Sequence, residues 1–113
     1  MIQVSEKASF YAHVVAERIA MWSVAPGVSF ISRAEHRNWG IALHIDSRAL
    51  MPQQMHDALE RRFVQAHLFS DYFVFLNVQR DFVVWHAAPE FGGSMGDIRE
   101  RELMLVGLGH LNH

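Results

Sequence analysis

The sequence contains no cysteine, a single lysine (Lys7), three prolines and no long apolar run. Without cysteine, the chain cannot form disulfides, thiolate zinc sites or a cysteine nucleophile. No apolar run approaches the roughly 20 residues that a membrane span requires. Residues 1–7 also lack the basic and apolar segments of a secretory signal. We therefore expect a soluble cytoplasmic protein with no membrane span.

Length, charge and apolar content narrow the class of protein further. The 113 residues carry a formal net charge of −2, and half of them are hydrophobic. A chain of this length is one domain, residues 1–113, and can bury a sizeable core. General nucleic-acid binders carry a clustered basic excess, which this chain lacks. We expect a folded α+β domain with no nucleic-acid partner.

The first half of the sequence predicts one helix followed by two strands. Apolar residues at helical spacing indicate a helix from Ser5 to about Trp22. Pro26-Gly27 ends this helix with a turn. Residues 28–33 and 39–45 then alternate apolar and polar side chains, which is typical of strands.

The second half predicts a helix, a hairpin and a last helix. Pro52 suits the first turn of a helix, and an apolar stripe follows it. Aromatic and β-branched residues from Tyr72 to Trp85, interrupted by a short polar turn, predict a hairpin. A last helix starts near Ser94, which can cap it. The stripe after Pro52 consists of Met55, Leu59, Phe63 and Ala66.

The predicted order is α-β-β-α-β-β-α, and two hairpins favour an antiparallel sheet flanked by helices. A strand with one buried face alternates apolar and polar residues, but the Tyr72–Trp85 hairpin is apolar on both faces. We therefore expect a dimer in which part of this hairpin meets a second chain. Which of its two faces does so stays open. The candidate interface residues are Phe73, Phe75, Val83 and Trp85.

The sequence contains no motif that predicts catalysis or a cofactor. No nucleophile is placed beside a base in a recognisable arrangement, so we expect no enzymatic activity, catalytic residue or cofactor. His44 and Asp46 fall on one strand face at a spacing that a metal or ligand site could use. No His-Glu-x-x-His signature is present, and we assign no metal. Arg33, Arg37 and Trp39 are a weaker candidate for contacts with nucleic acid.

The second hairpin also carries a family resemblance. Phe73–Leu76, a polar turn, residues 82–89 (FVVWHAAP) and a leucine-rich terminal helix, in this element order, resemble the class I type III secretion chaperones of bacteria. The resemblance implies a homodimer, or a heterodimer with a related chaperone. It also implies apolar patches that hold an extended, non-globular segment of an exported client. The family commonly has a third strand in the first sheet segment, whereas this sequence predicts only two strands there.

We therefore expect a small protein-binding module, a secretion chaperone that holds a client segment. Two alternatives remain at this point. A roadblock-like dimerisation and regulatory module shares much of the same element order. A small ligand- or metal-binding domain, or an enzyme, would use His44 and Asp46.

Overall fold

The computed structural model describes residues 1–89 and 94–112, which form a mixed α+β fold. Residues 88–93, which connect the predicted hairpin to the predicted last helix, lie partly outside the described residues. The chain order is β1 (Ile2–Val4), α1 (Lys7–Val15), β2 (Ala20–Ala25), β3 (Val28–Glu35), β4 (Asn38–Ile45), α2 (Pro52–Val64), α3 (Ala66–Phe69), β5 (Phe73–Leu76), β6 (Phe82–Ala87), α4 (Met95–Leu105) and a 3-10 turn, η1 (Gly109–Leu111).

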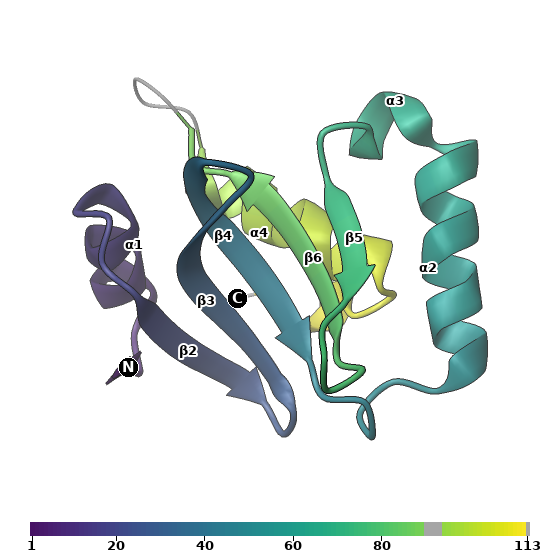
Figure 1. The fold of residues 1–113 in the computed structure, drawn as a ribbon, viewed down its shortest axis with the longest axis horizontal. Coiled ribbons are helices and arrows are strands. Elements are labelled where there is room, and N and C mark those ends of the chain that lie inside the picture. The colour runs from purple at the N-terminus through teal and green to yellow at the C-terminus, as the bar shows by residue number, and fades with distance from the viewer. Residues whose placement is uncertain (90–93, 113) are drawn as a thin grey trace.

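A six-stranded sheet in the order β1-β2-β3-β4-β6-β5 forms the centre of the fold (Figure 1). Every pairing is antiparallel except that of β1 with β2, which is parallel. The strands β2, β3 and β4 form a meander, and β4 pairs with β6 of the second hairpin. The predicted antiparallel sheet flanked by helices is confirmed, with six strands instead of four.

The predicted first helix is wrong in its second half. The helix α1 ends at Val15, Glu17 adopts a left-handed backbone with φ 53°, and β2 begins at Ala20. Ala20, Trp22 and Val24 alternate toward the main core. Ile19 and Trp22 also fit helical spacing, so the pattern alone could not separate the two structures. The strand β2 is a third strand in the first sheet segment; this strand is common in the family that the sequence resembles, but the sequence pattern did not predict it here.

One face of the sheet and the helices α1 and α4 enclose the main core. The sheet contributes alternate residues of β3, β4 and β6, and the helices contribute Phe10 and Val14 from α1 and Leu103 and Leu105 from α4. The helices α2 and α3 lie beyond the β5 edge (Figure 1). Among the described residues, no helix is long and apolar enough to cross a membrane.

The start of α4 follows the predicted capping pattern, and its middle carries two buried charged residues. The Asp97 N–H donates to the Ser94 Oγ at 3.1 Å. Further along, Arg99 is buried over the rings of Trp22 and Phe30. Glu102 is fully buried, and neither of its carboxylate oxygens has a hydrogen-bond partner among the described residues.

Burial raises the pKa of Glu102 well above its ordinary value, and the charge of Arg99 offsets only part of this effect. Burial and the nearby Glu102 also raise the pKa of Tyr72 to about 12. Glu102 therefore holds its proton more tightly in the folded chain than in the unfolded chain. The resulting stability is fully present below the unfolded pKa and is lost as the pH rises toward the folded value.

We predict that Glu102→Gln stabilises the protein at pH 7 to 8 by about 1 to 3 kcal/mol, because an amide needs no proton to stay neutral when buried. The gain should shrink toward pH 4.5. Urea unfolding across this pH range measures it. Glu100→Gln, on the exposed side of the same helix, is the matched control and should change little. Equal stability of wild type and Glu102→Gln at every pH would contradict the prediction.

Candidate protein-binding surface

The four predicted interface residues lie on one face of the sheet. Phe73 pairs with Trp85, and Phe75 pairs with Val83. In register with them, Met21, Ile31 and Ala42 continue the row across the sheet. We call the face of the sheet that points away from the main core the open face. None of its described residues belongs to the main hydrophobic core that α1 and α4 cover.

Two of the four predicted interface residues on the open face are already buried by other residues of the same chain. Val83 is fully buried and Trp85 is 1% exposed, and they form a second small core with Ile31 and Ala42. Phe73 stays 43% exposed and Phe75 is half-buried. Phe73 and Phe75 are thus accessible to a partner, while Val83 and Trp85 form the floor beneath them.

Trp85 is buried without a covering helix because Gly40 leaves room for its ring. A Cβ atom at Gly40 would lie 2.4 Å from the Trp85 ring and 2.4 Å from the His86 carbonyl oxygen. The Trp85 indole N–H also donates to the Arg33 carbonyl at 3.3 Å. The indole therefore packs against Gly40 of the neighbouring strand, and almost none of its surface remains for a partner.

A tight turn between β3 and β4 places His36 against this aromatic group. His36 and Arg37 both have positive φ angles, 50° and 67°, between the paired residues Glu35 and Asn38. This is the geometry of a two-residue turn that normally favours Asn-Gly. The centroid of the His36 ring lies 4.2 Å from that of the Phe73 ring and 5.7 Å from that of the Trp85 ring.

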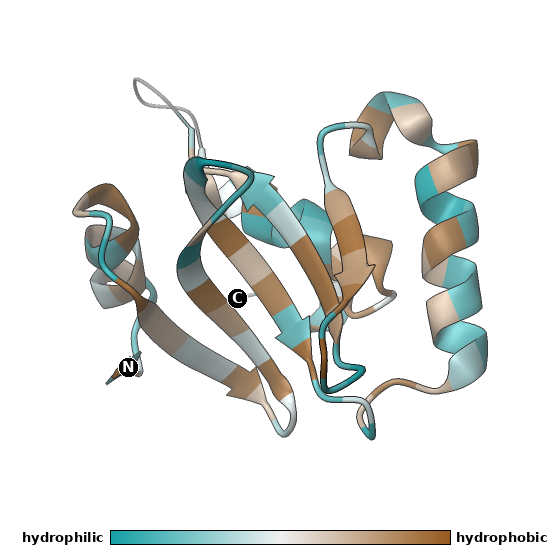
Figure 2. Ribbon diagram, in the orientation of Figure 1, coloured by the Kyte–Doolittle hydropathy of each residue, from teal (hydrophilic) through white to brown (hydrophobic). Residues whose placement is uncertain are grey.

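The helix α2 presents its apolar stripe to solvent. Ala58 is its only buried residue, while Leu59 is 53% exposed, Phe63 84% and Val64 69%. Alternating apolar and polar bands follow the length of α2 in Figure 2. Of the predicted stripe, Met55, Leu59 and Phe63 lie on α2, whereas Ala66 lies in α3. Met55 alone packs on the main core, and the other three are exposed.

Two arginines attach α2 to the rest of the fold. Arg61 donates to the Leu105 carbonyl at the end of α4, where a cation also favours the helix dipole. The Arg62 Nε donates to the Tyr72 carbonyl at 2.8 Å. The helix is therefore held beside β5 by polar contacts at its inner side, and its apolar side remains uncovered.

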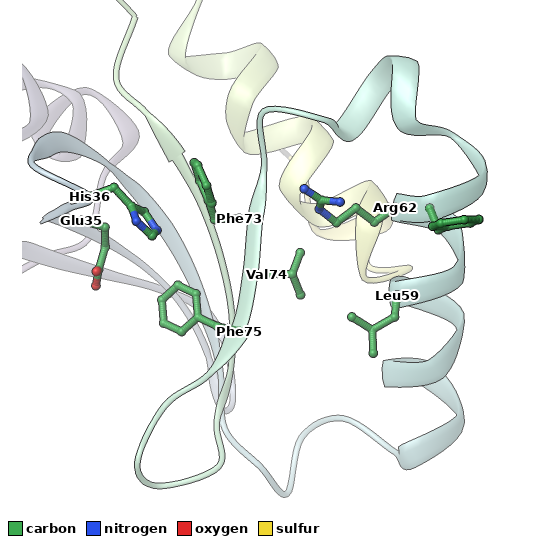
Figure 3. A pocket seen from close by; sticks show the side chains of 8 residues that line it. Glu35, His36, Leu59, Arg62, Phe73, Val74 and Phe75 are labelled. Atoms are coloured by element: carbon green, nitrogen blue, oxygen red, sulfur yellow. The ribbon is translucent and has the colours of Figure 1, made fainter.

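A depression of about 540 Å³ lies where the edge of β5 meets α2. In Figure 3, Phe73 and Phe75 lie on one side of β5 with His36. Val74 points from the other side of β5 toward Leu59 of α2 (Figure 3). The strand β5 is the last strand of the sheet and pairs only with β6 within the described residues. The lining residues are Glu35, His36, Leu59, Arg62, Phe63, Phe73, Val74 and Phe75.

In the structure, His44 and Asp46 have different partners. The His44 Nε2 lies 3.2 Å from the Asp81 carboxylate and 3.2 Å from the Asn77 amide nitrogen. Asp46 instead accepts from the Arg48 N–H, the main cause of its lowered pKa. Within residues 1–89 and 94–112, no three His, Asp or Glu side chains gather as metal ligands would. Asp81, which sequence analysis did not assign, is the partner of His44.

The basic and aromatic residues of the first hairpin do not form one surface. Arg33 lies on the open face and pairs with Glu35. Trp39 packs toward the main core and donates its indole N–H to the Ser32 Oγ at 2.8 Å. Arg33 and Trp39 of the nucleic-acid candidate therefore lie on opposite faces of the sheet.

A comparison with protein families matches residues 1–108 to the HrpV-like family. The chain belongs to the HrpV-like family. This family is associated with type III secretion, so the chain is a type III secretion-related protein. The resemblance to proteins of type III secretion is confirmed, whereas the match does not identify the chain as a class I chaperone. No curated protein and no solved structure matches the chain.

The different burial of Trp85 and Phe73 predicts different effects on stability. Trp85→Ala should lower the free energy of unfolding by about 3 to 5 kcal/mol, because it empties the small core of the open face. Phe73→Ala, which removes a ring that is 43% exposed, should cost less than about half as much. Urea unfolding of both variants measures the difference. Equal losses would contradict the assignment of Trp85 to the core and Phe73 to the surface.

Proposed function

We propose that this type III secretion-related protein is a chaperone that works as a homodimer and holds an extended segment of an exported client. The observation that supports it is the uncovered apolar surface formed by α2 and the edge of β5. We name this surface the α2–β5 surface; Leu59, Phe63, Phe73, Val74 and Phe75 belong to it because they line one depression. Leu59, Phe63 and Phe73 are each at least 43% exposed, and Val74 and Phe75 are half-buried.

The extent of the α2–β5 surface favours a protein partner. Its five side chains leave on the order of 500 Å² of apolar area in water, while a standard interface covers about 800 Å² on each partner. An interface needs only a few large anchors near its centre, and Phe63 and Phe73 fit this role. Exposed apolar area of this size on a single chain favours association.

A second copy of the chain satisfies the open edge of β5 as well as the apolar side chains. Two β5 edges related by a two-fold axis can pair antiparallel, because a two-fold contact joins the same surface of both chains. The exposed stripe of each α2 then packs beside the new pair of strands. A sheet edge left unpaired would instead favour uncontrolled aggregation.

In this proposal the dimer binds its client without catalysis. Apolar client side chains would pack on surfaces beside the interface, and the client backbone would pair with a sheet edge. Binding of this kind keeps an aggregation-prone segment soluble and extended. A roadblock-like regulator would also dimerise but would hold no client, so client binding separates the two functions. No observation favours a metal-dependent or enzymatic role for His44 and Asp46.

Light scattering should give the wild-type protein twice the chain mass of 13.0 kDa. Phe63→Glu should give a folded monomer, because it places a charge at the centre of the contact. Val78→Glu is the matched control, since Val78 is fully exposed in the turn after β5 and should leave the dimer intact. A monomeric wild type would refute the dimer, and loss of the dimer in Val78→Glu would refute the assigned surface.

Client binding can be tested by co-expressing the chain with type III substrates encoded beside its gene. Gel filtration should show one substrate eluting with the dimer, and mass spectrometry should identify it. The bound segment should be cleaved by protease more slowly than the same segment alone. If each substrate elutes separately and is digested at the same rate with or without the dimer, the chaperone proposal fails.

A further inference from the structure

The first strand of the sheet differs from all the others. The strand β1 has three residues, and its parallel partner is β2. It sits at the edge of the sheet opposite to β5. Parallel pairing is slightly weaker per residue than antiparallel pairing, and three residues supply few hydrogen bonds. The structure therefore holds β1 by a small number of contacts.

The strand β1 covers only half of the edge on which it lies. It pairs with Ala20, Met21 and Trp22, while the rest of β2, through Ala25, has no partner on that side in the described structure. The open half contains Val24, which packs partly against the main core. A longer extended segment would pair with the whole of β2.

Apolar side chains remain exposed where β1 meets the rest of the fold. Ile2 is 47% exposed, and Val4 is the residue of β1 that packs against the main core. Ile19, next to the paired Ala20, is 51% exposed. The edge thus offers more apolar surface than the present strand covers.

We propose that β1 is an exchangeable strand that occupies the edge of β2 until a client segment replaces it. The replacing segment is extended, longer than three residues, and carries apolar side chains at alternate positions, as Ile2 and Val4 do. The inference rests on the proposed function, because it names where the client of the chaperone pairs. Since β1 and β5 are opposite edges of the sheet, a dimer formed through β5 leaves this site accessible.

Exchange requires that β1 leaves the edge of β2 for part of the time. The smaller the fraction of time that the edge is open, the weaker the apparent affinity for a competing strand. Weakening β1 in the full chain should therefore tighten binding of a strand supplied in trans. The probe is a fluorescent peptide with the sequence of residues 1–7, MIQVSEK. Fluorescence anisotropy measures its dissociation constant.

Val4→Asp should bind the peptide at least about tenfold more tightly than the wild type, because a charge in place of the packed valine releases β1. Val78→Asp, far along the chain in an exposed turn, is the matched control and should bind as the wild type does. A thermal melt checks that Val4→Asp is folded. Equal affinity of folded Val4→Asp and the wild type would overturn the proposal.

A second variant tests the same site without weakening the core. Gln3 and Met21 are paired in register, and the chain has no other cysteine, so Gln3→Cys with Met21→Cys should form a single disulfide across β1 and β2. The oxidised form should not bind the peptide at concentrations that half-saturate the reduced form. The variant with Gln3→Cys alone should bind equally in both conditions. Unchanged binding by the oxidised double variant would overturn the proposal.

The two proposals fail in different ways. Light scattering of the same samples reports the dimer independently of the peptide. A dimer in which Val4→Asp gains no affinity refutes strand exchange and leaves the α2–β5 surface in place. A monomer in which Val4→Asp gains affinity refutes the dimer, while the exchange of β1 stands.

Discussion

The pairing of β4 with β6 joins the two halves of the sheet, and the surfaces on either side depend on it. Six residue pairs, from Gly40↔Ala87 to Ile45↔Phe82, connect segments about forty residues apart in the chain. On one face this ladder supplies the central part of the main core under α4. On the other it places Trp85 across Gly40 and fixes the aromatic group at the β5 edge. Without it, the hairpin of β5 and β6 would have no sheet to extend.

Much of the fold follows from local pattern. The strands β3 and β4, the start of α2 at Pro52, the hairpin of β5 and β6 and the cap at Ser94 follow from the sequence, because each has a period or a turn signal of its own. The boundary between α1 and β2 does not. It depends on the left-handed backbone at Glu17, and glutamate carries no signal for that conformation. The strand β1 is too short for a period and exists only through its pairing with β2.

The candidate surface was predictable only in part, for a related reason. Periodicity identifies an apolar stripe on α2 but not what covers it, and in this fold the small Ala58 packs inward while Leu59 and Phe63 face out. Likewise, alternation places Phe73, Phe75, Val83 and Trp85 on one face. The burial of Trp85 depends on the missing Cβ of Gly40, far away in the sequence. The partner of His44 is set by the return of the chain at Asp81, which spacing along one strand cannot show.

The long separation between β4 and β6 has a consequence for how the chain is made. The strands β2, β3 and β4 leave the ribosome well before residues 82–105 do, so their core face waits for β6 and α4 to be synthesised. Pairings between distant segments form slowly because a long loop must close first. During this interval the nascent chain carries an unprotected apolar sheet. During its synthesis the chain therefore exposes apolar surface that must be kept from aggregating, as an extended apolar client does.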